Sequence, residues 1–330
     1  MNPLSTTRPV EKLNIMSVNR LAELLKIPKE KLVELAEFSR SHYSPFEMQS
    51  CPRPFQRIFI KKKRQIDNPQ GDLKRVQRRI NNLLLQPICF PENLLGGIPK
   101  RSVTDNAHHH LKASLLVTLD VKSCFPSITN PHVYRVWQIF LGCSTPVSKL
   151  LTKLTTFNRY LPQGAPTSPL LANLVIWMFD EPIRRACEER SVNYSTWIDD
   201  LAFSGDRARE LIQIAVLVLA KGGLKVSRSK IRIMGPRDVK LLTGTRLGGR
   251  SVRVPKEKLS RIRSGIHKLE AGLIQRKDQI KFIDGIVGQL RYVKHLNPKD
   301  ASALIENLAL TVNGTQTSAS ATKFLGSKRQ

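Results

Sequence analysis

Hydrophobic spacing along the N-terminal part of the chain predicts two kinds of element. Leucines recur every three or four positions across residues 17–39, so two short helices separated by a proline are expected. Apolar and polar residues alternate over residues 55–66, as in a strand with one buried face. Residues 72–88 return to helical spacing, with apolar side chains on one face and a row of lysine and arginine on the other.

The middle of the chain has the pattern of a unit that mixes strands and helices. Residues 113–121 form an apolar run that ends in an acid, as expected for a buried strand. Residues 133–142 and 166–189 have helical spacing and predict one short and one long helix. Residues 193–205 predict a strand hairpin with two adjacent acids at its tip.

The C-terminal part is mostly helical in pattern. A helix is expected over residues 209–223, followed by short strands within 225–234 and 240–247. Residues 255–310 return to helical spacing and carry many lysines and arginines. The remaining residues, 313–330, are rich in Ser, Thr, Gly and Asn and predict a loosely ordered tail.

The charge balance narrows the kind of partner. The 330 residues include 54 Lys and Arg against 26 Asp and Glu, so the formal net charge is 54 − 26 = +28. A surface this positive indicates a polyanionic partner, and nucleic acid is the first expectation. It argues against a protein that acts alone on a small neutral metabolite.

The cysteines and the hydropathy bear on location. The five cysteines include no CxxC pair and are odd in number, which argues against a disulfide framework or a zinc module and favours a reducing compartment. The N-terminus lacks the apolar core of a signal peptide, and no run of about 18 apolar residues is present. We therefore expect a cytoplasmic protein that does not insert into a membrane.

Acids are scarce in this chain, so acids at strand ends are informative. Asp120 closes an apolar run, and Asp199 and Asp200 stand at the tip of the predicted hairpin. A carboxylate beside a buried strand is costly unless it is paired or bound to a cation. Three converging carboxylates in a basic protein form a site for Mg²⁺, which takes carboxylates together with substrate phosphates. The plain alternative is that the paired acids only make a turn.

The segment Leu161–Pro169 is a turn-rich loop that precedes the long predicted helix. Its backbone N–H groups and Gln163 can face a nucleotide, and Ser168 is a candidate helix cap. Such a loop is weak evidence alone. The order is more specific: a strand ending in an acid, this loop and its helix, the paired-acid hairpin, and then a glycine followed by Lys230.

This order of motifs resembles that of the reverse transcriptases. In that family an aromatic residue follows the strand-end acid five positions on, and here Phe125 follows Asp120. The loop LPQGAPTSP is similar to the family's nucleotide- and template-contacting loop. The family's paired acids usually stand as Tyr-x-Asp-Asp, whereas this chain has Trp197, which keeps the aromatic ring and loses the hydroxyl. The resemblance covers about residues 55–310.

Two further segments resemble signatures of retron reverse transcriptases. Residues 106–110, Asn-Ala-His-His-His, match the pattern NAxxH, and Leu242-Thr243-Gly244 resembles the triplet VTG. The length also fits a retron enzyme without maturase or endonuclease extensions. Read without this context, the three histidines would be a surface cluster or a chance metal site.

The resemblance implies an α+β, right-hand polymerase fold with fingers, an RRM-like palm built on an antiparallel sheet, and a helical thumb. The expected division is an N-terminal helical segment over 1–50, fingers over 51–112, palm over 113–248, thumb over 249–312 and a flexible tail over 313–330.

The resemblance also implies an activity and its partners. Retron enzymes are RNA-directed DNA polymerases that bind a structured non-coding RNA (msr–msd), prime from the 2′-hydroxyl of an internal guanosine and copy part of that RNA into branched msDNA. The expected cofactor is Mg²⁺, two ions, with Mn²⁺ as a substitute. The substrates are dNTPs, and a separate effector protein is expected as a partner in anti-phage defence.

The roles that the resemblance implies fall into three groups. The catalytic and metal-binding residues are Asp120, Asp199 and Asp200. The nucleotide-binding residues are Lys62, Lys63, Arg64, Phe125, Gln163, Gly164 and Lys230. The residues that contact RNA or template–primer are Asn106, His110, Pro162, Trp197, Thr243, Gly244, Arg261 and Lys268.

Two other functions remain open on the sequence. One is a different bacterial reverse transcriptase, of the abortive-infection or group II type. The other is an RNA-binding scaffold with an inert polymerase fold, in which Trp197 would be a sign of decay.

Overall fold

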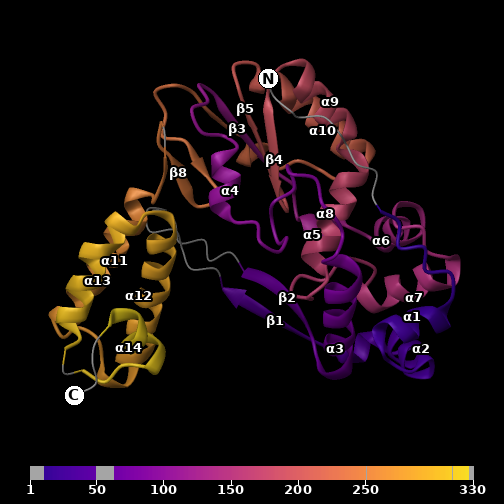
Figure 1. Ribbon diagram of the computed structural model, residues 1–330, viewed down its shortest axis with the longest axis horizontal. Coiled ribbons are helices and arrows are strands. Elements are labelled where there is room, and N and C mark those ends of the chain that lie inside the picture. Colours follow the sequence, from indigo (N-terminus) through magenta and orange to yellow (C-terminus); the bar gives the residue numbers. More distant parts are fainter. Residues whose placement is uncertain (1–10, 50–62, 250, 314, 327–330) are drawn as a thin grey trace. The chain divides into compact units, whose positions relative to one another are not determined.

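The computed structural model describes residues 11–49, 63–249, 251–313 and 315–326 (Figure 1). The chain divides into two compact units. The first combines Met1–Ser102 with Ser114–Ile233, and the second combines Val103–Ala113 with Met234–Gln330. These limits differ from the expected bounds of fingers, palm and thumb. Compactness alone does not identify such subdomains. The division into fingers, palm and thumb therefore remains a prediction.

The first unit begins with the two helices that the leucine spacing predicts, α1 (Val18–Leu25) and α2 (Lys29–Glu37). Ser17 caps α1, because its hydroxyl accepts a hydrogen bond of 3.1 Å from the backbone N–H of Arg20. The leucines on the shared face are fully or almost fully buried: Leu21, Leu25, Leu32 and Leu35. Helix α1 packs against α3 (Gly71–Ile80), both helices pack against α7 (Thr145–Thr155), and both join the main core.

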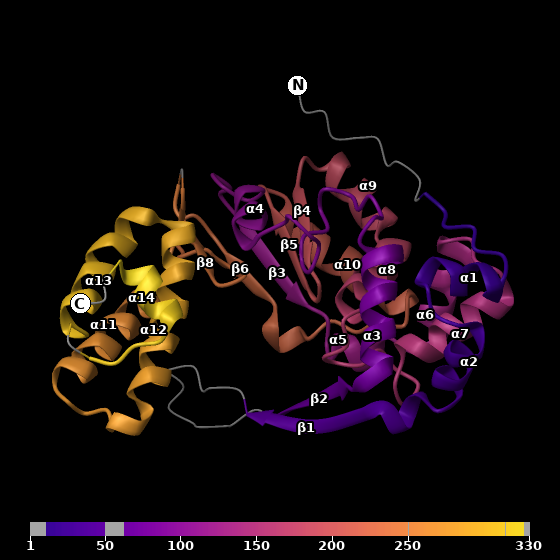
Figure 2. The ribbon, with the colours of Figure 1, turned by 60° about the horizontal axis from the view of Figure 1, so that its bottom comes forward.

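An antiparallel hairpin follows, made of β1 (Tyr43–Gln49) and β2 (Lys63–Pro69), which lie side by side in Figure 2. The strand expected at residues 55–66 therefore continues to Pro69, and its part before Lys63 lies outside the described residues. Strand β1 was not predicted, because its apolar residues do not alternate regularly with polar ones. The basic amphipathic helix is confirmed as α3 (Gly71–Ile80), which continues as a π-helical turn over Asn81–Leu85.

A four-stranded sheet forms the centre of the first unit. It consists of β3 (Leu116–Asp120), β4 (Asn193–Trp197), β5 (Asp200–Ser204) and β6 (Arg232–Met234), in the order β4-β5-β3-β6. Strand β5 is antiparallel to both β3 and β4. With helices after β3 and after β5, the chain order is β-α-β-β-α-β, the ferredoxin-like arrangement. This confirms the α+β class and the expected RRM-like sheet.

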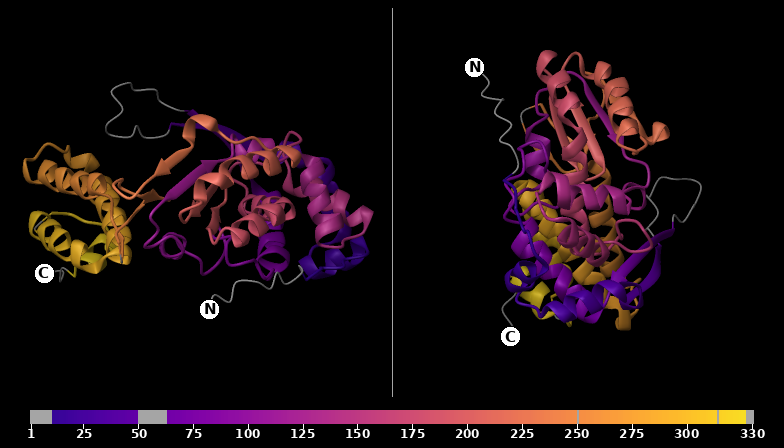
Figure 3. Two further views of the ribbon diagram at one scale, coloured as in Figure 1. Left: turned by 90° about the horizontal axis from the view of Figure 1, so that it is seen from above. Right: turned by 90° about the vertical axis from the view of Figure 1, so that its right-hand side faces the viewer.

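Helices connect and cover these strands. They are α5 (Cys124–Ser127), α6 (Asn130–Arg135) with a π-helical turn at Val136–Phe140, α7 (Thr145–Thr155), α8 (Ser168–Phe179), α9 (Glu181–Glu189), a 3₁₀ turn at Ala208–Glu210, and α10 (Leu211–Lys221). Helix α9 packs against β4 and α10 packs against α9, so both lie alongside the sheet (Figure 3).

The single long helix expected at residues 166–189 is wrong, because the chain breaks at Asp180 into α8 and α9. Pro182 stands in the first turn of α9, where its missing N–H costs nothing, but it could not continue a helix from α8. The carboxylate of Asp180 is buried at the break and accepts a hydrogen bond of 2.9 Å from Arg184. A proline in the middle of a helical pattern was the available signal.

The second unit combines one early helix with the C-terminal part of the chain. It contains α4 (Val103–His108), a three-stranded sheet of β7 (Leu241–Leu242), β8 (Thr245–Leu247) and β9 (Val252–Arg253), and the helices α11 (Lys256–Glu270), α12 (Arg276–Leu296), α13 (Pro298–Thr311) and α14 (Ala319–Leu325). Ala107 of α4 belongs to the same buried cluster as Ile262, Ile283 and Leu290.

The expected loose tail differs from the structure between residues 319 and 325, where α14 forms. Ser318 caps this helix, and its hydroxyl also donates a hydrogen bond of 2.5 Å to Asp284. Ala321 is fully buried, and the guanidinium of Arg291 lies 5.3 Å from the Phe324 ring centroid. No helix within the described residues is both long and apolar enough to cross a membrane.

Candidate active site

Two neighbouring strands bring the three acids to one end of the central sheet. Asp120 is the last residue of β3 and lies opposite Asp200, the first residue of β5. Asp199 precedes it in the hairpin turn, and its carbonyl accepts a hydrogen bond of 2.8 Å from the N–H of Val121. On the other side, the carbonyl of Asp120 accepts one of 2.8 Å from Ser227. Backbone bonds therefore fix the sheet end on which the acids stand.

The turn before the paired acids is strained and braced. Ile198 has a φ of 57°, a left-handed conformation that a β-branched residue rarely adopts. A loop from earlier in the chain packs against this turn: Thr196 donates a 2.7 Å hydrogen bond to the carbonyl of Asn93. In this loop Gly96 comes so close that a Cβ there would lie 2.6 Å from the backbone nitrogen of Ile198. Sequence reasoning missed this loop, and the pair Gly96-Gly97 was its only signal.

The acids are partly removed from water and repel one another. Burial raises the pKa of Asp200 to about 6, and the charges of Asp199 and Asp120 add to the shift. Burial also raises the pKa of Asp199, again with a contribution from Asp120. A cation at this place would relieve both effects.

Lys230 provides one positive charge at the acids. It ends a 3₁₀ turn (Arg228–Lys230), and its ammonium contacts Oδ1 of Asp120. The other carboxylate oxygen, Oδ2, is buried and finds no hydrogen-bond partner among the described residues. An orphaned carboxylate oxygen beside two further carboxylates has the donor chemistry of a Mg²⁺ site. Within the described ranges, no three His, Cys, Asp or Glu side chains already form a closed metal centre, so the fit rests on this donor chemistry.

The glycine-containing loop Leu161–Pro169 is fastened to strand β2. The N–H of Asp67 donates a 2.8 Å hydrogen bond to the carbonyl of Gln163, and the Asp67 carboxylate accepts one of 3.3 Å from the Gln163 N–H. Gly164 has a φ of 125°, and a Cβ there would lie 3.0 Å from the Ile66 side chain. Asp67 is almost fully buried. Sequence reasoning missed it, because a lone acid in a basic strand carries no pattern.

The loop residues differ in exposure. Pro162 is buried, Gln163 is half-buried and Gly164 is exposed. The expected cap at Ser168 is wrong: Thr167 holds the N-cap position of α8, and the Ser168 hydroxyl donates a 2.6 Å hydrogen bond back to the Pro162 carbonyl.

The three cations expected at the triphosphate are not equivalent. Lys62 lies outside the described residues. Lys63 forms a 2.7 Å ion pair with Glu47 across the hairpin. Arg64 is exposed, and its charge acts on Asp199, where it lowers the pKa against the larger effect of burial. Of the two described cations, Arg64 is therefore the one that the structure relates to the acids.

Two aromatic residues near the acids are half-buried. Phe125 lies in the short helix α5 and packs against the main core. Trp197 ends β4 and lies opposite Asp200 in the strand register. Cys124, the residue before Phe125, is buried, and burial together with the charges of Asp199 and Asp120 raises the pKa of its thiol.

The remaining candidates lie in the second unit. Arg261 and Lys268 are exposed on α11. Asn106 and His110 are buried to within 1 % of full burial, and burial lowers the pKa of His110 to about 3, so the ring is neutral. Direct RNA contact by these two side chains does not agree with their burial. Asn106 instead donates a 2.7 Å hydrogen bond to the hydroxyl of Thr243.

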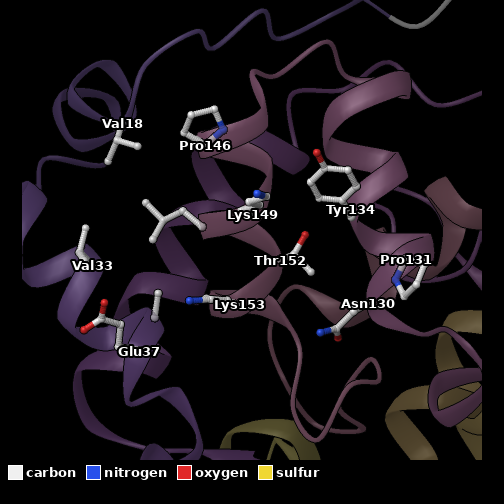
Figure 4. Close-up of a pocket in the computed structure, with 12 residues that line it drawn as sticks. Val18, Val33, Glu37, Asn130, Pro131, Tyr134, Pro146, Lys149, Thr152 and Lys153 are labelled. Carbon is white, nitrogen blue, oxygen red and sulfur yellow. The ribbon is translucent and has the colours of Figure 1, made fainter.

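A groove of about 630 Å³ opens elsewhere in the first unit, between the N-terminal helices and the α6–α7 region (Figure 4). Its lining is mostly apolar, with Val18 and Val33 of the N-terminal helices on one side and Tyr134 of α6 and Pro146 of α7 on the other. None of the candidate site residues lines it.

Comparison with known proteins identifies the family. The family model for reverse transcriptase (RNA-dependent DNA polymerase) matches residues 52–282, which is more than half of the chain. The chain therefore belongs to the reverse transcriptase family, and it is an RNA-directed DNA polymerase by class.

Several curated relatives of the chain are retron reverse transcriptases. The chain is 28 % identical to Retron Ec86 reverse transcriptase of Escherichia coli over 74 % of this chain and 75 % of that protein. It is 29 % identical to Retron Mx65 reverse transcriptase of Myxococcus xanthus, over 80 % of this chain and 66 % of that protein. It is 26 % identical to Retron Se72 reverse transcriptase of Salmonella heidelberg, over 68 % and 59 % respectively. These matches confirm the resemblance to retron reverse transcriptases.

The chain spans just under two thirds of the second relative and less of the third. Among solved structures, a foamy viral protease–reverse transcriptase in complex with double-stranded DNA aligns with 98 % of this chain and 50 % of its own, at 15 % identity and a TM-score of 0.45. A structural similarity this weak assigns no role to any residue of this chain.

Proposed function

We propose that this protein is a retron-type reverse transcriptase that copies part of a cognate structured RNA into branched msDNA. Synthesis would start from the 2′-hydroxyl of an internal guanosine in the msr–msd RNA and consume dNTPs. The retron relatives, the NAxxH-like and LTG segments and the large positive charge support this function. An effector protein and a role in anti-phage defence belong to the same proposal, since they follow only from the resemblance.

The single observation that carries the proposal is the register pair Asp120–Asp200 with Asp199 in the adjoining turn. Three carboxylates at one sheet end, in a chain this basic, are costly without a counter-cation. Asp120 and Asp199 would hold the divalent cations, with Asp200 assisting. Two bound Mg²⁺ ions, or Mn²⁺ in their place, would supply Lewis-acid stabilisation of the attacking and leaving oxygens.

The other residues of the first unit would bind and orient the nucleotide. Arg64, with Lys62 and Lys63 beside it in sequence, would hold the triphosphate, for which a guanidinium offers paired donors. Gln163 and Gly164 would line the base and sugar pocket, fixed by their attachment to β2. Phe125 would exclude a ribose 2′-hydroxyl by bulk. Lys230 would neutralise or protonate the leaving pyrophosphate.

The second unit would hold RNA. Helix α11 presents exposed basic side chains on successive turns, among them Arg261 and Lys268. Such side chains grip phosphates, and A-form RNA is recognised mainly by shape and backbone because its deep groove is closed to side chains. Binding should therefore weaken steeply as salt rises.

The experiment is to express the protein with its native flanking DNA and analyse the nucleic acid that co-purifies, on denaturing gels before and after RNase. A discrete DNA band that shifts with RNase is expected, and it should vanish in the variant Asp199→Ala/Asp200→Ala. RNA alone in both samples would indicate an inert RNA-binding scaffold. DNA whose migration RNase does not change would indicate another kind of bacterial reverse transcriptase, without the branched linkage.

A further inference from the structure

A strained two-residue turn joins β7 and β8. Leu242 pairs with Thr245, so Thr243 and Gly244 alone form the loop. Both have positive φ, 45° for Thr243 and 77° for Gly244, which is the signature of a type I′ turn. Glycine suits that conformation, but threonine is β-branched and is disfavoured there. Something outside the turn must therefore hold Thr243 in place.

Two side chains from different helices hold it. Asn106 of α4 donates a 2.7 Å hydrogen bond from Nδ2 to Oγ1 of Thr243. Tyr292 of α12 donates a 3.0 Å hydrogen bond from its hydroxyl to the carbonyl of Gly244. The Tyr292 ring is itself fixed, since the ammonium of Lys258 lies 3.4 Å from its centroid.

The supports and the turn differ in exposure. Asn106 is 1 % exposed, whereas Gly244 is exposed and Thr243 half-exposed. The turn can thus meet a ligand that Asn106 cannot reach. Exposed basic side chains of α11, in the same unit, favour an anionic ligand.

We infer that Asn106 and Tyr292 are positioning residues that lock the Thr243–Gly244 turn in the conformation that binds the RNA backbone. Asn106 acts through the turn and not by touching RNA. This inference rests on the proposed function, because it takes RNA as the partner of the second unit.

The test measures affinity for the RNA transcribed from the DNA flanking the gene, labelled with a fluorophore, by anisotropy. Asn106→Ala and Thr243→Val each remove the same hydrogen bond, and each should weaken binding about tenfold. The double variant should bind no more weakly than either single variant, since the bond can be lost only once. Thr243→Ser keeps the hydroxyl and should bind like the unmodified protein.

A rescue variant separates positioning from direct contact. Asparagine adopts the left-handed conformation readily, and Asn-Gly is one of the strongly preferred pairs in type I′ turns. Thr243→Asn should therefore restore affinity in the Asn106→Ala background. A merely structural role would not give this rescue, and neither would direct RNA contact by Asn106.

Thr311→Val is the matched control, because it removes hydrogen bonds to Glu270 and Asn307 elsewhere in the same unit. It should leave RNA affinity unchanged, and melting temperatures of all variants check that they are folded. Additive losses, or no rescue by Thr243→Asn, would overturn this inference while leaving the proposed function intact. Failure of the unmodified protein to bind the RNA would overturn both.

Discussion

The ammonium of Lys230 contacts one oxygen of Asp120, while the other oxygen of that carboxylate is buried without a hydrogen-bond partner in the described part of the chain. The lysine thus supplies positive charge where a divalent cation would also be held. A bound divalent cation would therefore be repelled by the Lys230 ammonium at Asp120.

Lys230→Met should therefore raise the affinity for Mn²⁺ in the absence of nucleotide. We expect a gain of roughly tenfold, a modest figure because the lysine is half-exposed and screened by water. Mn²⁺ titration followed by electron paramagnetic resonance measures this without catalysis. Arg232→Gln is the control, since its charge also acts on Asp200 without contacting Asp120. Equal gains in both variants would show a general charge effect instead of competition at Asp120.

Gly96→Ala should abolish most of the polymerase activity. The added Cβ would lie 2.6 Å from the backbone nitrogen of Ile198 and 2.8 Å from the backbone carbon of Trp197, so the turn before the paired acids must move. Primer extension with saturating dNTP measures the loss, which should exceed tenfold. Gly249→Ala, where a Cβ meets nothing within 4 Å, should behave like the unmodified protein. Normal activity of Gly96→Ala would mean that the turn tolerates displacement.

Asp67→Ala should raise KM for dNTP about tenfold with a smaller effect on kcat, because the carboxylate holds the Gln163 backbone and not a reacting atom. Asp67→Asn keeps a carbonyl acceptor and should recover most of the affinity. Asp238→Ala loses a comparable bond, 2.8 Å to the Gly235 N–H in the second unit, and serves as the control. A selective fall in kcat would place Asp67 closer to the chemistry.

Phe125→Ala should allow ribonucleotides to be incorporated, since the ring's bulk would be removed from beneath the sugar. The measurement is single-nucleotide extension with paired rNTP and dNTP. Phe140→Ala removes a half-buried phenylalanine that meets Trp177 edge-on at 5.1 Å between centroids, and it should keep the preference for dNTP. An unchanged dNTP preference in Phe125→Ala would exclude Phe125 as the selecting residue.

Asp180 should make stability depend on pH. Burial raises its pKa to about 6, although Arg184 and Asn93 favour the charged form. The pKa of an aspartate in the unfolded chain is about 3.9, so the folded state binds more protons than the unfolded state between about pH 4 and pH 6. The stability contribution is present below this window and is lost as pH rises through it. The melting temperature of the unmodified protein minus that of Asp180→Asn should therefore fall from pH 4 to pH 6.5. A difference that rises with pH would contradict this assignment.

Local patterns predicted much of the fold and the acids that meet at one end of the central sheet. Helical leucine spacing identified α1 and α2, and strand-end placement identified Asp120 and the Asp199-Asp200 pair. These features depend on residues near one another in sequence.

What sequence reasoning missed depends on contacts between distant segments. Gly96 meets Ile198, and Asp67 holds Gln163, about a hundred residues away in each case. The burial of Asn106 was equally hidden, because a polar residue is expected at the surface unless its partner is known.

Helix α4 belongs to the second unit, although the whole segment 114–233 of the first unit is translated before its partners. Protein synthesis adds about 5–20 residues per second, so the apolar side chains that bury Ala107 are translated on the order of ten seconds after it. All of the first unit is therefore translated before the second unit is complete. The second unit can complete its core only after the C-terminal helices have been translated. A chaperone that shields α4 on the ribosome would have its main effect in that interval.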